Sequence, residues 1–157
     1  MSDLPVRIVT LEPMRVASAH AYGPHPEGPA WDKLIAWAQP KGLLDDPAAH
    51  RIFGFNNPNP SPGSPNYGYE FWIQVGPEVE AEGEIEIKPF AGGRYAVTRC
   101  ESLSQIGQVW KQLAAWSQES AYAHGTHQWL EEQIAPAPSA PQPEGELVLD
   151  LYLPISE

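Results

Sequence analysis

The sequence contains the same half-domain pattern twice, about 79 residues apart. WDKLIAW at residues 31–37 matches WKQLAAW at 110–116, and the same shift places RVA at 15–17 on RYA at 94–96. At nearly the same shift, YEFWI at 69–73 matches LDLYL at 149–153. A repeat of this length predicts duplicated architecture. We expect one domain over residues 1–157, with copies at about 5–78 and 83–155 around a pseudo-two-fold axis and a ligand cleft between them.

Composition supports a single globular domain. The chain has 157 residues, of which 42% are hydrophobic, and six tryptophans supply large side chains for a core despite 18 prolines. Its single cysteine, Cys100, has no second cysteine with which to form an internal disulfide and is expected to be a small core residue. The N-terminus shows no basic patch followed by an apolar run, so we expect no signal peptide, no membrane span and a cytoplasmic location.

The charge balance argues against direct nucleic-acid binding. Nine Lys and Arg against twenty Asp and Glu give a net charge of −11, whereas gripping phosphates requires clustered cations. An acidic surface raises the local concentration of cationic ligands, although it also serves solubility.

Hydrophobic periodicity predicts a β-α-β-β order in each copy. Apolar residues recur at helical spacing over 27–38 and about 102–119. The strand at 127–134 is expected from its match to residues 50–55 at a shift of 77, because local propensity alone also allows a helix. The other expected strands cover 6–11, 14–22, 51–55, 67–75, 84–87, 94–99 and 147–153, the last closed by Pro154.

These elements predict an α+β fold. Antiparallel sheets would carry the two main helices on one side, leaving the opposite face for a cleft. Loops rich in proline are expected at 57–65 and 135–145, and Gly92-Gly93 is expected to turn a hairpin.

The order of the motifs resembles the GyrI-like effector-binding domains, which occur alone and fused to AraC-type and MerR-type multidrug-responsive regulators. The resemblance rests on LEPMRVA at 11–17, YEFW at 69–72, GGRYAV at 92–97, LDLYLPI at 149–155 and the two Trp-xx-Leu-xx-Trp helices. It implies two β-α-β-β units and a bacterial stand-alone sensor or sequestering protein. Because no DNA-reading element is seen, transcription regulation would require a partner regulator.

The resemblance also implies lipophilic, often cationic small molecules held between aromatic side chains. A buried glutamate near the end of the second unit would face the positive charge. That position falls on Glu131, with Glu132 as the competing assignment, and Gln133 stands where the family commonly has an aromatic residue. Burying a carboxylate is costly unless a cation or hydrogen-bond donors offset it, and aromatic faces add cation–π attraction.

Aromatic residues on the expected strands are the other candidate ligand contacts. Trp129 and Trp72 are the expected stacking pair, whereas most helix tryptophans are expected to pack in the core. The remaining candidates are Tyr69, Tyr95, Phe53, Phe55 and Trp110.

Other chemistry finds little support in the sequence. His124 and His127 are three residues apart, but a metal site needs three or four convergent ligands, so we expect no metal and no cofactor. No Gly-x-Ser-x-Gly elbow is present. Two alternatives to ligand binding remain open, both suggested by the resemblance. One is hydrolysis of reactive electrophiles with Glu131 activating water, and the other is inhibitor-type binding to a topoisomerase.

Overall fold

The computed structural model describes residues 5–46, 49–57, 62–101, 105–126, 128–135 and 148–156. The chain forms two compact units. The first unit is Met14–Phe90, and the second unit combines Met1–Pro13 with Ala91–Glu157. Among the described residues, no helix is both long and apolar enough to cross a membrane.

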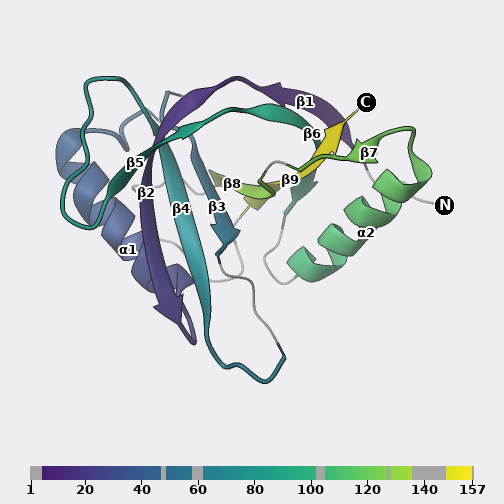
Figure 1. The fold of residues 1–157 in the computed structure, drawn as a ribbon, viewed down its shortest axis with the longest axis horizontal. Coiled ribbons are helices and arrows are strands. Elements are labelled where there is room, and N and C mark those ends of the chain that lie inside the picture. Colours follow the sequence, from purple (N-terminus) through teal and green to yellow (C-terminus); the bar gives the residue numbers. More distant parts are fainter. Residues whose placement is uncertain are drawn as a thin grey trace. The chain divides into compact units, whose positions relative to one another are not determined.

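The first unit is an antiparallel sheet with one helix. Its strands lie in the order β5-β2-β4-β3. Helix α1 packs against β2 and β4 (Figure 1), where Leu34 and Ala38 join Ala17, Ala19 and Ile73 in the core. The elements are β2 Met14–Gly23, α1 Glu27–Ala38, the short 3-10 helix η1 Gln39–Lys41, β3 Ile52–Asn56, β4 Tyr67–Val75 and β5 Glu86–Phe90.

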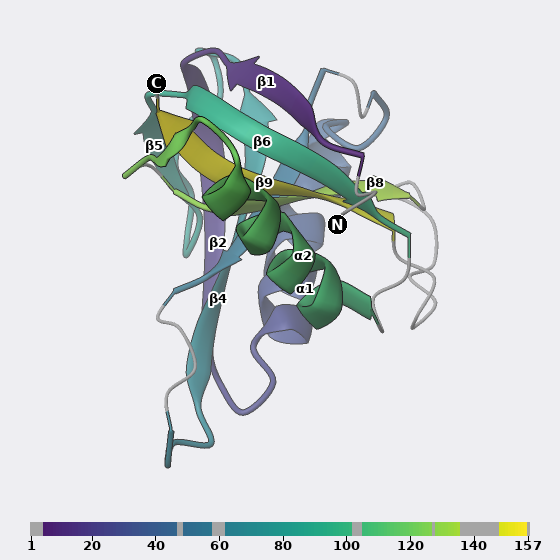
Figure 2. The same cartoon turned by 90° about the vertical axis from the view of Figure 1, so that its right-hand side faces the viewer.

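The second unit repeats this arrangement. Its strands lie in the order β1-β6-β9-β8, and β7 also pairs with β9. Helix α2 lies along β6 and β9 (Figure 2), where Val109 and Leu113 pack on Ala96, Leu151 and Leu153. The elements are β1 Arg7–Leu11, β6 Gly93–Cys100, α2 Ile106–Glu119, β7 Ala123–His124, β8 Leu130–Ala135 and β9 Val148–Ser156.

The α+β prediction and the β-α-β-β order are confirmed, since β2-α1-β3-β4 and β6-α2-β8-β9 match element by element. Pro29 lies in the first turn of α1, where its missing N–H costs little. Strand β1 pairs with β6, so this N-terminal strand belongs to the unit of the second copy. The single-domain assignment and the cleft between the copies stay predictions.

Three strands differ from the expected ones by more than one residue at an end. Strand β5 begins at Glu86, because Glu82 and Ile85 exchange two backbone hydrogen bonds in a turn around Gly83. Strand β8 begins at Leu130, because the carbonyl of Gln128 accepts a hydrogen bond from the Tyr95 hydroxyl at 2.5 Å. His127 and most of the 135–145 loop lie outside the described residues.

The third difference is at the end of β9, which continues through Pro154 to Ser156. The Pro154 carbonyl accepts the N–H of Gly125, and the last residues pair with β7.

The expected hairpin at Gly92-Gly93 is wrong. Strand β5 pairs with β2, and β6 pairs with β1 and β9, so these glycines connect strands that have other partners. Gly92 has φ +80°, and a Cβ there would lie 2.2 Å from the Leu11 carbonyl oxygen. Glycine is therefore required by both conformation and space.

Candidate functional site

The two adjacent glutamates of β8 point to opposite faces of the second unit's sheet. Glu131 pairs with Leu151, which packs in the core formed with α2. Glu132 pairs with Asp150, and directly paired residues share a face. Glu132 therefore lies on the face away from α2.

Glu132 forms a compact polar contact on this face. It is only 7% exposed, and the Tyr152 hydroxyl donates a 2.5 Å hydrogen bond to its Oε1 atom. The ring of Tyr152 meets Tyr95 edge to face, with centroids 5.3 Å apart. Tyr95 is fully buried, which raises the pKa of its hydroxyl. A buried carboxylate among aromatic rings is the arrangement expected for a cation site.

Glu131 belongs to a different cluster, on the helix side. Its Oε2 atom accepts a 3.0 Å hydrogen bond from Trp110 Nε1. Trp110 lies 5.4 Å from Trp129, whose other neighbour is the ring of His124. Trp129 is 41% exposed. The structure thus brings together three of the sequence-predicted residues on the helix side of the sheet, away from Glu132: Glu131, Trp110 and Trp129.

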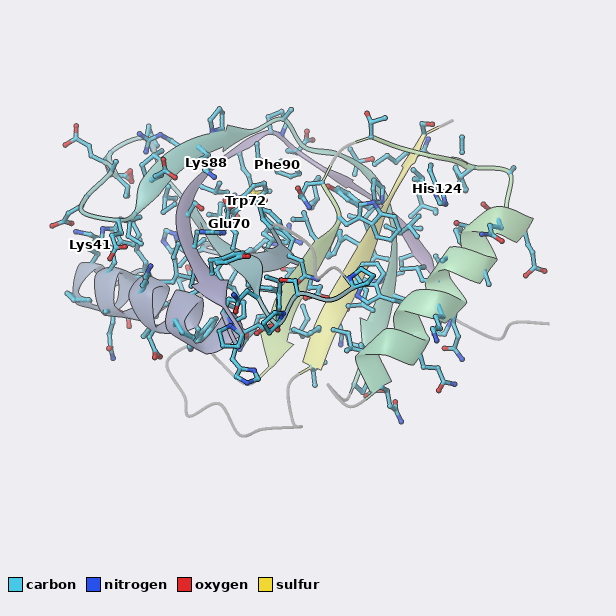
Figure 3. All side chains as sticks on the ribbon, turned by 60° about the horizontal axis from the view of Figure 1, so that its bottom comes forward. Lys41, Glu70, Trp72, Lys88, Phe90 and His124 are labelled. Atoms are coloured by element: carbon cyan, nitrogen blue, oxygen red, sulfur yellow. The ribbon has the colours of Figure 1, made fainter. Side chains whose placement is uncertain are left out.

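The first unit gathers the predicted aromatic residues of strands β3 and β4. Phe53 pairs directly with Trp72, and the ring of Phe55 meets Trp72 edge to face at 4.8 Å. Phe90 also contacts Trp72, and the centroids of the two rings are 5.2 Å apart (Figure 3). Tyr69 is on the helix side of β4, where it contacts Phe71.

A buried carboxylate, Glu70, lies within this aromatic face. It is 2% exposed and accepts four hydrogen bonds. Its Oε2 atom accepts from Ser18 Oγ at 2.6 Å, Trp72 Nε1 at 2.6 Å and Lys88 Nζ at 2.8 Å, and Oε1 accepts from Asn57 at 3.0 Å. Burial by itself would raise the pKa of Glu70, but these donors outweigh it and lower the pKa.

The second unit buries Asp150 at the matching position of β9. Asp150 is 3% exposed and binds two guanidinium groups. Arg99 Nε lies 2.6 Å from its Oδ1 atom, and Arg7 Nη2 lies 2.7 Å from Oδ2. Each unit therefore pairs a carboxylate on its central strand with a cation from its edge strand, Lys88 on β5 or Arg7 on β1.

The copies differ at one informative pair. Phe55 pairs with Glu70 in the first unit, and Glu132 pairs with Asp150 in the second. Trp72 and Tyr152 likewise occupy equivalent places, facing Phe53 and Leu130. The apolar contact of Phe55 with Trp72 is thus replaced by the hydrogen bond of Tyr152 to Glu132. Because the first unit is built with Phe55 at this place, the architecture itself does not require a carboxylate there.

The sequence reasoning missed Glu70, Asp150 and their basic partners. Arg7 and Asp150 are 143 residues apart, so no local pattern links them. One signal was present in the repeat: YEFWI and LDLYL place an acidic residue at the same position of two otherwise apolar strands.

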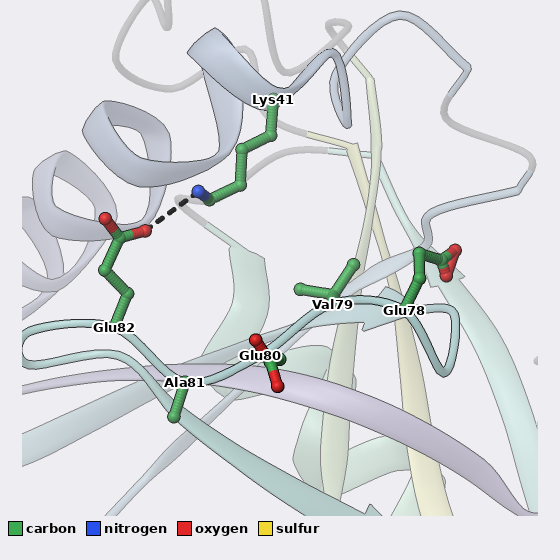
Figure 4. Close-up of a pocket in the computed structure, with 6 residues that line it drawn as sticks. All are labelled: Lys41, Glu78, Val79, Glu80, Ala81 and Glu82. Atoms are coloured by element: carbon green, nitrogen blue, oxygen red, sulfur yellow. Dashed lines mark hydrogen bonds and ion pairs between the residues drawn. The ribbon is translucent and has the colours of Figure 1, made fainter.

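A surface pocket of about 360 Å³ lies elsewhere in the first unit (Figure 4). It is lined by Lys41 and residues 78–82, among which Glu82 binds Lys41 at 2.8 Å. Its lining contains no aromatic side chain, so it is a poor match for a lipophilic ligand. Within the described part of the chain, no group of three or more His, Cys, Asp or Glu could hold a metal ion.

Solved structures share this fold over nearly the whole chain. The EcmrR C-terminal domain matches with a TM-score of 0.73 and 15% identity, covering 99% of each chain. The chain spans 57% of the length of EcmrR in its complex with DNA, with a TM-score of 0.72 and 14% identity. SAV2435 bound to tetraphenylphosphonium matches with a TM-score of 0.55 and 13% identity, covering 98% of this chain and 94% of that one.

A hydrolase from Listeria innocua also shares the fold, with a TM-score of 0.66, 10% identity and coverage of 96% of this chain and 91% of that one. No curated protein matches the sequence. The model of the GyrI-like small molecule binding domain matches residues 4–156. The chain therefore belongs to the GyrI-like family of small-molecule binding domains.

Proposed function

We propose that this protein binds lipophilic cations, with Glu132 as the counter-charge and Tyr152 as its hydrogen-bonded neighbour. The observation that carries the proposal is the difference between the copies. Glu132 and Tyr152 stand where the first unit has the apolar contact of Phe55 with Trp72. A carboxylate that the architecture does not need, kept in a buried place, is best explained by the ligand it attracts.

The surroundings of Glu132 suit this role. At 7% exposure its charge is weakly screened by water, so its attraction for a bound cation is stronger than at the surface. Aromatic rings nearby add cation–π and apolar contact without demanding one ligand shape. SAV2435, which shares the fold, binds tetraphenylphosphonium, and that ion is a suitable probe. The proposal replaces Glu131, the first sequence candidate, with its neighbour.

The first test is a titration with tetraphenylphosphonium, followed by tryptophan fluorescence and calorimetry, in wild type, Glu132→Gln and Glu131→Gln. We expect micromolar binding by wild type and a loss of affinity of about tenfold in Glu132→Gln, or about 1.4 kcal/mol. Glu131→Gln removes the same charge from the opposite face of β8 and should change affinity less than threefold.

Glu84→Gln serves as the control, because Glu84 is an exposed partner of Lys33 in the first unit. Neutral triphenylphosphine oxide should bind wild type and Glu132→Gln equally. Equal affinity of wild type and Glu132→Gln for the cation would overturn the assignment of Glu132. A loss confined to Glu131→Gln would return the role to the cluster of Trp110 and Trp129.

The contact of Glu132 with Tyr152 favours hydrolysis as a second candidate function. A carboxylate could take a proton from water while the phenol gives one to a departing oxygen. For an epoxide, the water oxygen would bond to carbon, the carbon–oxygen bond would break, and the product would be a diol. We expect multiple turnover of styrene oxide by wild type, lost in both Glu132→Gln and Tyr152→Phe. Diol formation at the uncatalysed rate would exclude this candidate for epoxides.

A further inference from the structure

Strand β1 lies at the outer edge of the second unit's sheet. It stands at one end of the strand order β1-β6-β9-β8, and among the described strands it pairs with β6 alone. The outer side of an edge strand presents a row of backbone N–H and C=O groups that another chain can pair with. Proteins commonly protect such an edge with proline or with charged side chains.

The matching edge of the first unit is protected by a proline. Thr10 of β1 pairs with Arg94, whereas Pro89 of β5 pairs with Arg15, which is the repeat equivalent of Arg94. Proline has no N–H and is placed on an edge strand where the missing group would face away from the sheet. The N–H of Thr10 therefore faces away from β6, at a place where the first unit has no donor.

The contacts of Leu11 give the same direction. Leu11 pairs with Gly93, and its carbonyl oxygen lies so close to Gly92 that a Cβ there would collide with it. The backbone groups of Leu11 therefore point toward β6. Successive residues of a strand direct these groups to opposite sides, so those of Ile8 and Thr10 point outward. Both residues are exposed.

The outer edge of β1 is complementary to itself in an antiparallel arrangement. In a pairing centred on Val9, Ile8 of each copy lies opposite Thr10 of the other copy, and the two residues can exchange two hydrogen bonds. Arg7 begins the strand, Glu12 follows its end, and both are exposed. Antiparallel pairing brings the Arg7 end of each copy to the Glu12 end of the other, so opposite charges meet twice.

We propose that two copies of this protein join their sheets by antiparallel pairing of β1 with β1 across a two-fold axis. Both copies then contribute the same residues to the interface. A net charge of −11 makes two copies repel each other, but β1 itself contains no acidic residue. The side chain of Arg7 is 56% exposed although it binds Asp150, so it can also face Glu12 of the second copy.

Sedimentation velocity of wild type and Thr10→Pro tests the proposal at concentrations from about 1 μM to about 1 mM. One pair of short strands buries little surface, so we expect a weak dimer with a Kd of about 100 μM. Thr10→Pro gives β1 the residue that β5 carries at this position, and it should raise the Kd about tenfold or more. Thr10→Ser keeps the N–H and the hydroxyl and should match wild type.

Glu12→Lys tests the charge pairing at the two ends of the strand. We expect the Kd to rise about tenfold, because a cation would then face Arg7 of the second copy. Glu80→Lys is the control, since it makes the same change in net charge at an exposed residue of the first unit. Its Kd should stay within about threefold of wild type. An equal response of the two variants would overturn the proposed register.

Hydrogen exchange at single amides identifies the edge directly. Exchange at Ile8 and Thr10 should slow as the protein concentration rises, whereas exchange at Val9, whose N–H faces β6, should not change. A wild-type chain that stays monomeric, or a dimer that persists in folded Thr10→Pro, would overturn the proposal. Protection of the Thr10 amide that is independent of concentration would show that the same chain covers this edge, and would also overturn it. If Thr10→Pro does not fold, as judged by circular dichroism, Glu12→Lys and the exchange of wild type decide.

Discussion

Replacing Glu70 by Leu is expected to lower the free energy of unfolding by about 3 kcal/mol. The four side chains that donate hydrogen bonds to Glu70 lose their acceptor at once, and two of them, Ser18 and Trp72, are buried. Lys88 is partly exposed and can recover water, so its share of the loss is smaller. Urea denaturation followed by tryptophan fluorescence measures the change.

The control for this prediction is Glu82→Leu. Glu82 also accepts hydrogen bonds from a lysine and a tryptophan, Lys41 and Trp37, but it is exposed. Its replacement should leave the urea midpoint close to that of wild type. Equal losses in the two variants would mean that burial of the Glu70 network adds nothing to stability.

The Glu70 carboxylate makes the free energy of unfolding depend on pH. The pKa of Glu70 is lower in the folded protein than the value of about 4.3 in an unfolded chain. Its contribution is therefore complete above the unfolded pKa and is lost as pH falls through the folded pKa. The stability difference between wild type and Glu70→Gln should be largest near neutral pH and shrink below about pH 4. A difference that stays constant with pH would contradict this.

The second large effect is expected for Gly68→Ala, at about 3 kcal/mol or more. A Cβ at Gly68 would lie 1.9 Å from the carbonyl oxygen of Asn57 and 2.6 Å from its carbonyl carbon. Both are backbone atoms, and the N–H of Asn57 donates to the Gly68 carbonyl at 2.8 Å. The two strands must separate, which also disturbs the hydrogen bond of Asn57 to Glu70.

Gly28→Ala is the matched control, because a Cβ at Gly28 meets nothing within 4 Å. Gly28 lies in α1, where alanine is favoured, so the variant should be as stable as wild type or up to about 1 kcal/mol more stable. Thermal and urea denaturation of both variants test the prediction. Wild-type stability of Gly68→Ala would show that β3 and β4 can move apart at this point without cost.

The repeat and the periodicity were sufficient to predict the fold class and both helices. They set strand ends less well, because those ends depend on contacts distant in sequence. The Tyr95 hydroxyl donates a hydrogen bond to the carbonyl of Gln128 before β8 begins. Strand β7 pairs with the residues of β9 that follow Pro154. Neither contact leaves a local signal in the sequence.

The sequence left two neighbouring candidates for the counter-charge, Glu131 and Glu132, and the assignment stays a prediction. In a strand, a shift of one position moves a side chain to the other face, so Glu131 and Glu132 lie on opposite faces of the sheet and have different hydrogen-bond partners. The resemblance pointed to Glu131, with Glu132 as the alternative, and the face that each occupies depends on the pairing of Glu132 with Asp150. The contacts of Asp150 with Arg99 and Arg7 depend on the pairing of β9 with β6 and of β6 with β1, so no local pattern could predict them.

The pairing of β1 with β6 has a consequence for how the chain folds. The first unit is continuous, so every strand it needs has been synthesised once Phe90 is complete. Arg7, by contrast, pairs with Val97, a residue made 90 positions later. During synthesis β1 cannot pair with β6 until after the strands of the first unit have been made. Strand β1 is thus synthesised before the first unit but paired after it, and the ion pair of Arg7 with Asp150 is among the contacts that it then forms.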